Sequence, residues 1–407
     1  MDTLSGAWFA LAAASLPPAL DALGRWGRAG AFRSRPVAGR RPRRVLVLVP
    51  SRAEGVRPLA LCRDLVREAA AAEIRLDLRV VLDGTDAAAE AALAAEAIPF
   101  LVKDPAGPSK GKALAFATRT LLGSEPELLT AADFVMVFDA DMRLEEGFFS
   151  NLAVPEGADA FQLPVRPAGI PAPGPARVEA LSLAVATRVE DLARDAEGLP
   201  VRLRGKAMGF SPRSWREGPA AAYRTTAEDS EATLRLLGRG LRLRALPSPG
   251  AFDEASGDAE AMARPRARWL GGHLKLLVAG AADLVRIAVD SPRAAFVLAA
   301  DLWLRPRAIV LAFLLLVAVA ADATLVLLAL RRQTETVLPV LLASILSKAA
   351  LVFEFLAAGA ARDVLGTPPE LPPVTPRDLA AYLRMWLQAA FGTLRAPGAW
   401  HRARPEA

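Results

Sequence analysis

Short apolar runs separated by stretches with helical spacing dominate the first half of the chain. Residues 45–50 and 134–138 are continuous runs of strand-forming side chains, typical of strands buried on both faces of a parallel sheet. Between such runs, residues 59–72 carry apolar positions at helical intervals. The alternation of strand and helix predicts an α/β domain with a mostly parallel sheet. Further strands are expected at 76–82 and 98–102, and further helices at 87–97 and after the cap residue Ser109.

The pattern is less regular after the run that ends at residue 138. Residues 164–175 are rich in proline and predict a loop, and residues 177–193 predict a helix. Residues 205–212 are typical of a strand followed by a turn. Residues 225–229 are expected to head a helix that runs to Leu237, with a stop near Gly238.

Longer apolar segments lie at both ends of the chain. Residues 308–330 and 337–361 are each long enough to cross a bilayer, whereas residues 6–23 contain two prolines and an aspartate and predict either a short spanning helix or one lying in the interface. Amphipathic helices are expected at 274–304, with a break at Ser291, and at 379–394. The expected organisation is a membrane-associated segment with a basic linker (1–44), a cytoplasmic α/β domain (45–250), interface helices (251–306), two transmembrane helices (307–362), and an amphipathic helix with a basic tail (363–407).

Charge and composition narrow the function. The 407 residues include 50 Lys and Arg against 44 Asp and Glu, and 53% are hydrophobic. Arginines crowd the stretch after residue 24, which predicts that the following domain lies on the cytoplasmic side of the inner membrane. The apolar segments favour membrane lipid over nucleic acid as the partner of this positive charge. A single cysteine and two histidines exclude a disulfide and a histidine-rich zinc site, so any metal must bind carboxylates.

Two carboxylates, Asp139 and Asp141, follow the strand at 134–138. The carboxyl end of a parallel strand is where α/β proteins bind ligands. An Asp-x-Asp pair there can offer two hard oxygen ligands to Mg²⁺ or Mn²⁺, with phosphate oxygens completing the coordination. A solvated acidic turn is the alternative for the tripeptide alone.

Four short motifs occur in order along the chain. They are Asp83 in Val-Val-Leu-Asp-Gly, the Phe-Asp-Ala-Asp pair, Glu228-Asp229, and Arg268-Trp269. Together they resemble the family 2 glycosyltransferases, in particular the membrane-integrated branch of polysaccharide synthases and ceramide-glucosyltransferase-like enzymes. The resemblance covers roughly residues 45–273. It implies a GT-A fold and transfer of a sugar from a nucleotide-sugar, a UDP-sugar by preference, with inversion.

The resemblance also implies roles for individual residues. Asp83 matches the aspartate that contacts the nucleotide base, and Glu54 matches the acidic residue after the first strand. Asp229 matches the catalytic base, with Glu228 beside it in the substrate site, although acidic residues in a first helical turn also suit the helix dipole. Lys112 lies at a helix start that can approach phosphate. Arg268 matches the arginine that meets the diphosphate, and Trp269 matches the tryptophan that forms an aromatic wall near the acceptor.

Two motifs depart from the family pattern. The residue before Glu54 is Ala53, where the family usually has Asn. The (Gln/Arg)-x-x-Arg-Trp element has Pro265 at its first position, for which Arg264 or Arg266 are the available substitutes. We expect a glycan or lipid acceptor near the membrane and polysaccharide assembly as the leading case, with other assembly proteins as partners. The alternatives are transfer of a single sugar to a polyprenyl-phosphate or other lipid, and a catalytically silent membrane subunit.

Overall fold

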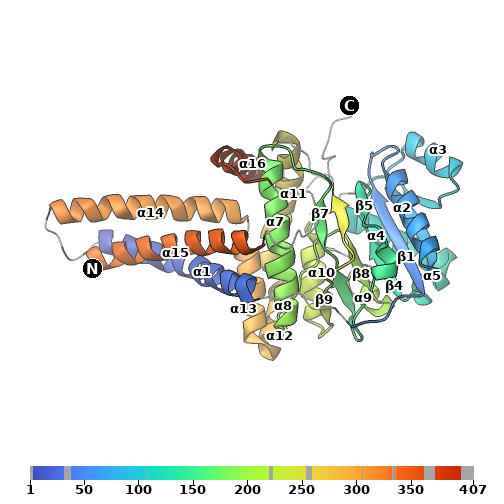
Figure 1. The fold of residues 1–407 in the computed structure, drawn as a ribbon, viewed down its shortest axis with the longest axis horizontal. Helices are drawn as coiled ribbons and strands as arrows, with labels where there is room; N and C mark the ends of the chain where they lie inside the picture. The colour runs from blue at the N-terminus through green and yellow to red at the C-terminus, as the bar shows by residue number, and fades with distance from the viewer. Residues whose placement is uncertain are drawn as a thin grey trace.

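The fold is described from a computed structural model. It describes residues 3–31, 38–107, 109–219, 223–253, 259–304, 306–331, 334, 336–361 and 372–395. An α/β domain makes up one end of the molecule, and three long helices extend from its other side (Figure 1).

A seven-stranded sheet in the order β3-β2-β1-β4-β8-β6-β9 forms the centre of the α/β domain. Strands β3, β2, β1 and β4 are parallel neighbours, β8 runs antiparallel to β4 and β6, and β9 is parallel to β6. The predicted α/β class with a mostly parallel sheet is therefore confirmed. The strands are β1 (Arg44–Ser51), β2 (Arg75–Asp83), β3 (Phe100–Lys103), β4 (Phe134–Val137), β6 (Ala160–Gln162), β8 (Met208–Phe210) and β9 (Leu243–Ala245).

The apolar run of β1 allows the sheet to be covered by helices on both faces. Side chains alternate across a strand, so Val47 packs into one core cluster and Leu48 into another. The first cluster joins β1 to α2 (Pro58–Ala71) and α3 (Ala87–Ala95), and the second joins it to helices on the opposite face. Those helices are α4 (Lys110–Ser124), α5 (Pro126–Thr130), α9 (Pro212–Glu217) and α10 (Glu228–Leu237).

A smaller sheet of order β5-β10-β7 lies beside the end of β4. It consists of β5 (Met142–Leu144), β7 (Val165–Pro167) and β10 (Ala251–Asp253), with β10 antiparallel to β5 and parallel to β7. The prediction that 164–175 is wholly a loop is therefore wrong for β7. A proline can occupy a strand at a sheet edge, where its missing N–H costs no ladder bond, and β7 is an edge strand.

The helix expected at 177–193 is present but not uniform. It runs as α7 (Pro175–Val185), a π-helical segment η1 (Ala186–Leu192) and α8 (Ala193–Ala196). A short helix α6 (Phe148–Asn151) follows β5. π-helical segments are rare and often occur at functional positions, which draws attention to the charged residues of η1.

Helices form at the expected amphipathic segments and pack against the α/β domain. The break predicted at Ser291 separates α12 (Ala281–Asp290) from α13 (Pro292–Trp303). These helices share a buried cluster with Leu234 of α10 and Leu276 of α11 (Ala259–Ala279). The last described helix, α16 (Pro376–Arg395), packs on α11 through Trp386.

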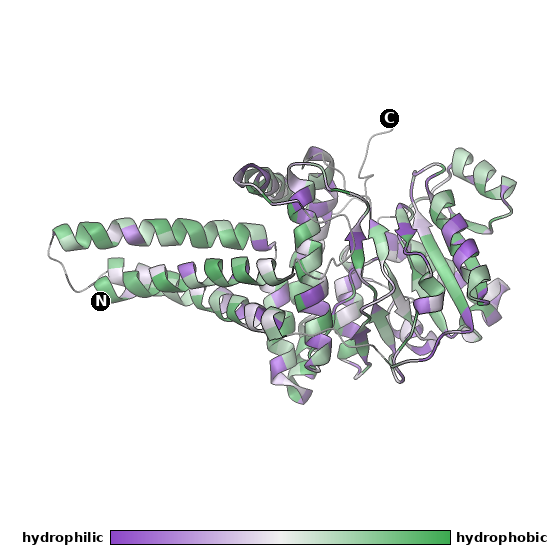
Figure 2. Cartoon of the chain, in the orientation of Figure 1, coloured by the Kyte–Doolittle hydropathy of each residue, from purple (hydrophilic) through white to green (hydrophobic). Residues whose placement is uncertain are grey.

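Three described helices are long and apolar enough to cross a membrane: Leu4–Ala31, Arg307–Leu330 and Val337–Ala360. They belong to α1 (Thr3–Ala31), α14 (Arg307–Leu330) and α15 (Val337–Ala361). Figure 2 shows α14 and α15 as mostly hydrophobic along their length. Trp8 of α1 packs near Val340, and Ala22 near Ala350, so α1 and α15 run in the same direction. The tail after residue 395 and the 362–371 linker lie outside the described residues.

Candidate active site

The carboxyl ends of three neighbouring parallel strands carry the acidic residues singled out by sequence. Asp83 is the last residue of β2, Glu54 follows β1, and Asp139 and Asp141 follow β4. Because β2, β1 and β4 are adjacent and parallel, these groups share one edge of the sheet, where such folds bind ligands.

Asp83 is buried and surrounded by donors. Its Oδ1 accepts a hydrogen bond from the Gly107 N–H at 2.8 Å and lies 3.1 Å from the Lys103 ammonium. Its Oδ2 is 3.6 Å from the Arg52 guanidinium but accepts no hydrogen bond from the described residues. The carboxylate is thus fixed in orientation and retains an acceptor oxygen.

A cluster of carboxylates and lysines forms the centre of the site. Lys110 pairs with Asp139 and also donates to the Gly205 carbonyl, and Lys206 pairs with Asp253. Burial, and after it the negative charges of Asp253 and Asp139, together raise the pKa of Asp141 to about 6. Burial lowers the pKa of Lys206, but the three carboxylates outweigh burial and raise it above its usual value.

This donor set fits a hard divalent cation bound through few protein ligands. No group of three or more His, Cys, Asp or Glu side chains in the described part of the chain is arranged to hold a metal. Mg²⁺ commonly binds one or two carboxylates together with substrate phosphates. Asp139 and Asp141 are the candidate pair, and a cation would relieve the repulsion between carboxylates that contributes to the raised pKa of Asp141.

The start of α10 forms the opposite wall. Gly111 of α4 lies so close to α10 that a Cβ there would be 3.1 Å from the Glu228 Cβ, and a Cβ on Gly205 would be 3.6 Å from the Asp229 Oδ2. Burial raises the pKa of Glu228 to about 7; Arg268 opposes this shift and Asp229 adds to it. The two acidic residues therefore face the start of α4 and the backbone at Gly205.

Arg268 and Trp269 lie on α11, which approaches α10 closely. The Thr226 hydroxyl donates to the Arg268 carbonyl at 2.9 Å, and a Cβ on Gly272 would lie 2.5 Å from the Ala227 nitrogen. The Arg268 side chain keeps two buried nitrogens, Nε and Nη1, without a hydrogen-bond partner among the described residues. Trp269 lies over the His273 ring, with centroids 3.9 Å apart.

Arg264 and Arg266, the possible substitutes for Pro265, do not contact the carboxylate cluster in the described structure. Arg266 pairs with Glu179 at 2.9 Å and lies over the Trp386 ring, and Arg264 is exposed beside Glu260. Pro265 itself lies within α11. The described contacts of both arginines are therefore with α7, α11 and α16, not with the carboxylate cluster.

At the start of α4, Lys110 rather than Lys112 reaches the carboxylates. The Lys112 side chain is exposed, while its backbone N–H donates to the Ser109 cap at 3.3 Å. Helical spacing places Lys110 on the buried face with Ala113 and Ala117. That periodicity was a usable signal for Lys110, whereas no motif in the sequence marked Lys206 or Asp253.

The chain is similar to solved glycosyltransferase structures at low identity. Its sequence matches no protein-family model and no curated protein. It is similar to the mannosyltransferase PcManGT from Pyrobaculum calidifontis, a complex with GDP-Man and Mn²⁺, at 16% identity and a TM-score of 0.49, over 86% of this chain and 99% of that one. It is also similar to glucosyl-3-phosphoglycerate synthase from Mycobacterium tuberculosis (16%, TM-score 0.37, 57% of this chain and 79% of that one) and to mannosyl-3-phosphoglycerate synthase from Rubrobacter xylanophilus (14%, TM-score 0.34, 61% and 74%).

Proposed function

We propose that this chain is an inverting, metal-dependent glycosyltransferase of the membrane-integrated family 2 type. It moves a sugar from a nucleotide-sugar to an acceptor near the membrane. The observation that carries the proposal is that four motifs far apart in sequence surround one edge of the sheet: Asp83, Asp139/Asp141, Glu228/Asp229 and Arg268.

The donor would occupy the side of the site nearest β2 and β4. Asp83 offers its free Oδ2 to the nucleotide base. Asp139 and Asp141 would hold Mg²⁺ or Mn²⁺, which when bound stabilises the negative charge that grows on the leaving diphosphate. Arg268 has two unpaired buried nitrogens able to donate to the same diphosphate.

Asp229 is assigned the role of base for the acceptor hydroxyl. Its Oδ1 accepts a hydrogen bond from the Ser230 N–H at 2.7 Å, while its Oδ2 faces the bare backbone of Gly205. Residue 205 therefore places no side chain against this oxygen. It would take the proton as the hydroxyl attacks the anomeric carbon from the face opposite the leaving group.

The three long apolar helices support a location in the inner membrane. α1, α14 and α15 would span the bilayer, and the arginine-rich stretch after α1 would keep the α/β domain on the cytoplasmic side. Exposed apolar side chains on α11, α12 and α13 suit the interface beside them: Val278, Val285, Val289, Phe296 and Trp303. The acceptor is then a glycan or lipid at the membrane surface, with exopolysaccharide or envelope glycan synthesis as the leading process.

Nucleotide release by the detergent-purified chain tests this function. UDP- and GDP-sugars are screened with Mg²⁺ or Mn²⁺, for the wild type and for Asp141→Asn, Asp229→Asn and the exposed control Asp290→Asn. We expect release from one donor, dependent on metal, with a loss of about 10²-fold or more in the two site variants and none in the control.

The same assay separates the alternatives. If every product carries a single sugar on a lipid, the chain transfers one sugar to a polyprenyl-phosphate or other lipid and does not make a polymer. Absence of release from every donor, even with native lipid and a partner extract, would favour a silent subunit. Equal release by wild type and Asp229→Asn would overturn the assigned base.

A further inference from the structure

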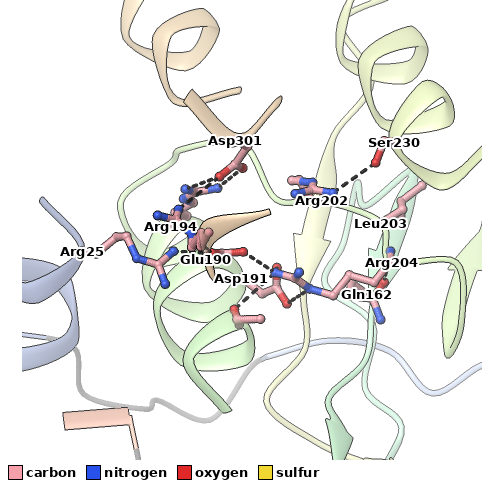
Figure 3. A network of polar contacts seen from close by, with 12 residues as sticks. Arg25, Gln162, Glu190, Asp191, Arg194, Arg202, Leu203, Arg204, Ser230 and Asp301 are labelled. Carbon is pink, nitrogen blue, oxygen red and sulfur yellow. Dashed lines mark hydrogen bonds and ion pairs between the residues drawn. The ribbon is translucent and has the colours of Figure 1, made fainter. Parts of the chain in front are cut away.

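A network of buried ion pairs lies between the α/β domain and the three long helices (Figure 3). Its centre is Glu190 of η1, whose side chain is 4% exposed. Glu190 pairs with Arg25 of α1, with Arg204 at 3.1 Å and with Arg307 of α14 at 3.6 Å. A buried carboxylate is costly unless it is paired, so these contacts fix η1 relative to the helices around it.

On one side the network reaches all three candidate membrane helices. Arg307 of α14 lies 2.8 Å from Asp21 of α1 and 2.9 Å from Glu354 of α15. Arg25 is also 3.3 Å from Glu354. Each long helix therefore contributes at least one charged group to the same set of contacts.

On the other side the network reaches the candidate active site through Arg204. Its guanidinium donates two hydrogen bonds to Asp191, both 2.8 Å long. Burial raises the pKa of Asp191, although Arg204 opposes the shift. The carbonyl of the next residue, Gly205, accepts a hydrogen bond from the Lys110 ammonium, and Lys206 pairs with Asp253.

The same segment also contacts the helix that carries the assigned base. Arg202, buried at 3% exposure, donates to the Ser230 hydroxyl at 3.1 Å. The Leu203 N–H donates to the Thr233 hydroxyl at 3.0 Å. Residues 201–204 have no regular secondary structure of their own, so side chains determine where the segment lies.

We propose that Arg204 is a positioning residue. The hydrogen bonds of its guanidinium to Asp191 and Glu190 fix the segment 202–206. This segment in turn places Lys206 and the Gly205 carbonyl at the carboxylate cluster, and Arg202 against α10. Because Glu190 is tied to Arg25 and Arg307, the geometry of the site depends on how the long helices dock. This inference rests on the proposed function, since it concerns the same carboxylates.

Geometry makes Arg204→Lys the informative substitution. Lysine keeps the charge but loses the planar fork, so it cannot make the two parallel bonds to Asp191. Arg194→Lys is the matched control. Arg194 is more deeply buried than Arg204, with a side chain 0% exposed against 14%, and makes the same kind of paired contact, to Asp301 at 2.6 and 3.1 Å. None of its described hydrogen bonds or ion pairs reaches residues 202–206.

Three quantities are measured on the full-length chain in detergent: Mn²⁺ affinity by electron paramagnetic resonance, turnover with the donor found by the screen, and the melting temperature. We expect Arg204→Lys to weaken Mn²⁺ binding several-fold and to lower kcat by about tenfold or more, since small displacements of reacting groups are expensive. KM for the donor should change less. Arg194→Lys should lower the melting temperature about as much as Arg204→Lys does, but should leave Mn²⁺ affinity unchanged.

A second variant covers the case in which Arg204→Lys does not fold. Glu190→Gln keeps the size of the side chain and removes only the charge, and it should shift Mn²⁺ affinity in the same direction. The inference would be overturned if these variants bound Mn²⁺ and turned over like the wild type. It would also be overturned if Arg194→Lys lost as much Mn²⁺ affinity and turnover as Arg204→Lys. A wild type that binds no Mn²⁺, or binds it equally after Asp141→Asn, would instead overturn the proposed metal site.

Discussion

Glu228 and Asp229 are adjacent carboxylates at the start of α10, but their surroundings differ. Asp229 accepts a hydrogen bond from the Ser230 N–H, whereas the Glu228 Oε2 has no hydrogen-bond partner among the described residues. Burial raises the pKa of Glu228 to about 7. A Glu228 carboxyl with a pKa near 7 can keep its proton at neutral pH.

The raised pKa of Glu228 predicts a pH-dependent stability. Its usual pKa of 4.5 applies to the unfolded chain and about 7 to the folded one. Between these values the folded state binds the proton and the unfolded state does not, so the contribution is full below pH 4.5 and is lost as pH rises through 7. Glu228→Gln should therefore stabilise the ligand-free protein at pH 8, by on the order of 3 kcal/mol at most, and change little at pH 4.5.

Thermal unfolding at the two pH values measures this effect, with Glu127→Gln on the exposed face of α5 as the control. An equal shift of the Glu228→Gln melting temperature at both pH values would contradict a buried, partly protonated carboxyl.

At the scale of elements, β8 follows closely after the segment 202–206 and connects it to the sheet. β8 lies between β4 and β6, and its middle residue is Gly209. A Cβ on Gly209 would come within 2.1 Å of the Phe161 ring, a distance that no pair of carbon atoms tolerates. Phe161 also packs edge-on to Phe134 of β4, so the ring has little freedom to move.

Gly209→Ala should accordingly destabilise the domain by about 3 kcal/mol or more through overpacking. Gly123→Ala, in α4 with open space around its Cα, should stabilise it by up to about 1 kcal/mol. Chemical unfolding of the two variants measures both changes. A Gly209→Ala protein as stable as the wild type would mean that β8 does not pack against Phe161 as described.

The sequence predicts elements well where local pattern decides them. The strands at 45–50 and 134–138 are recognisable because parallel strands buried on both faces are continuous apolar runs. The edge strand β7 is not, because its prolines are typical of loops and its pairing partner is distant in sequence.

The site is predictable in the same uneven way. Asp83, Asp139, Asp141 and the Glu228–Asp229 pair follow from motifs at strand and helix ends. Lys206 and Asp253 depend on tertiary contacts between segments that the chain order separates. The π-helical turn at η1, which directs Glu190 and Asp191 into the buried network, has no sequence pattern that distinguishes it from an ordinary helix.

At the scale of the whole molecule, the three long helices form a bundle with a polar contact well inside it. The Ser15 and Ser347 hydroxyls are 3.1 Å apart between α1 and α15. On the outer side, the Lys348 ammonium donates to Asp322 at 2.7 Å, and the Ser344 hydroxyl donates to the same oxygen at 2.8 Å. Asp322 is 15 residues after Arg307, about 22 Å along α14 at 1.5 Å per residue, so the pair would lie within the hydrocarbon region.

This position gives a test of whether the bundle spans a membrane. In lipid, Lys348→Met leaves an uncompensated carboxylate, which is costly there, so the amount of inserted protein should fall. The double variant Asp322→Asn with Lys348→Met removes both charges and should recover most of that amount, as measured in membrane fractions.

The exposed Arg63–Glu96 pair of the α/β domain is the matched control, because surface ion pairs contribute little in water. Arg63→Met should leave the inserted amount unchanged. If Lys348→Met behaves in the same way, Asp322 is solvated by water and α14 does not cross a bilayer. A loss in Lys348→Met that the second substitution repairs would place the pair in lipid, with the docked helices and the network at Glu190 forming the boundary between membrane and α/β domain.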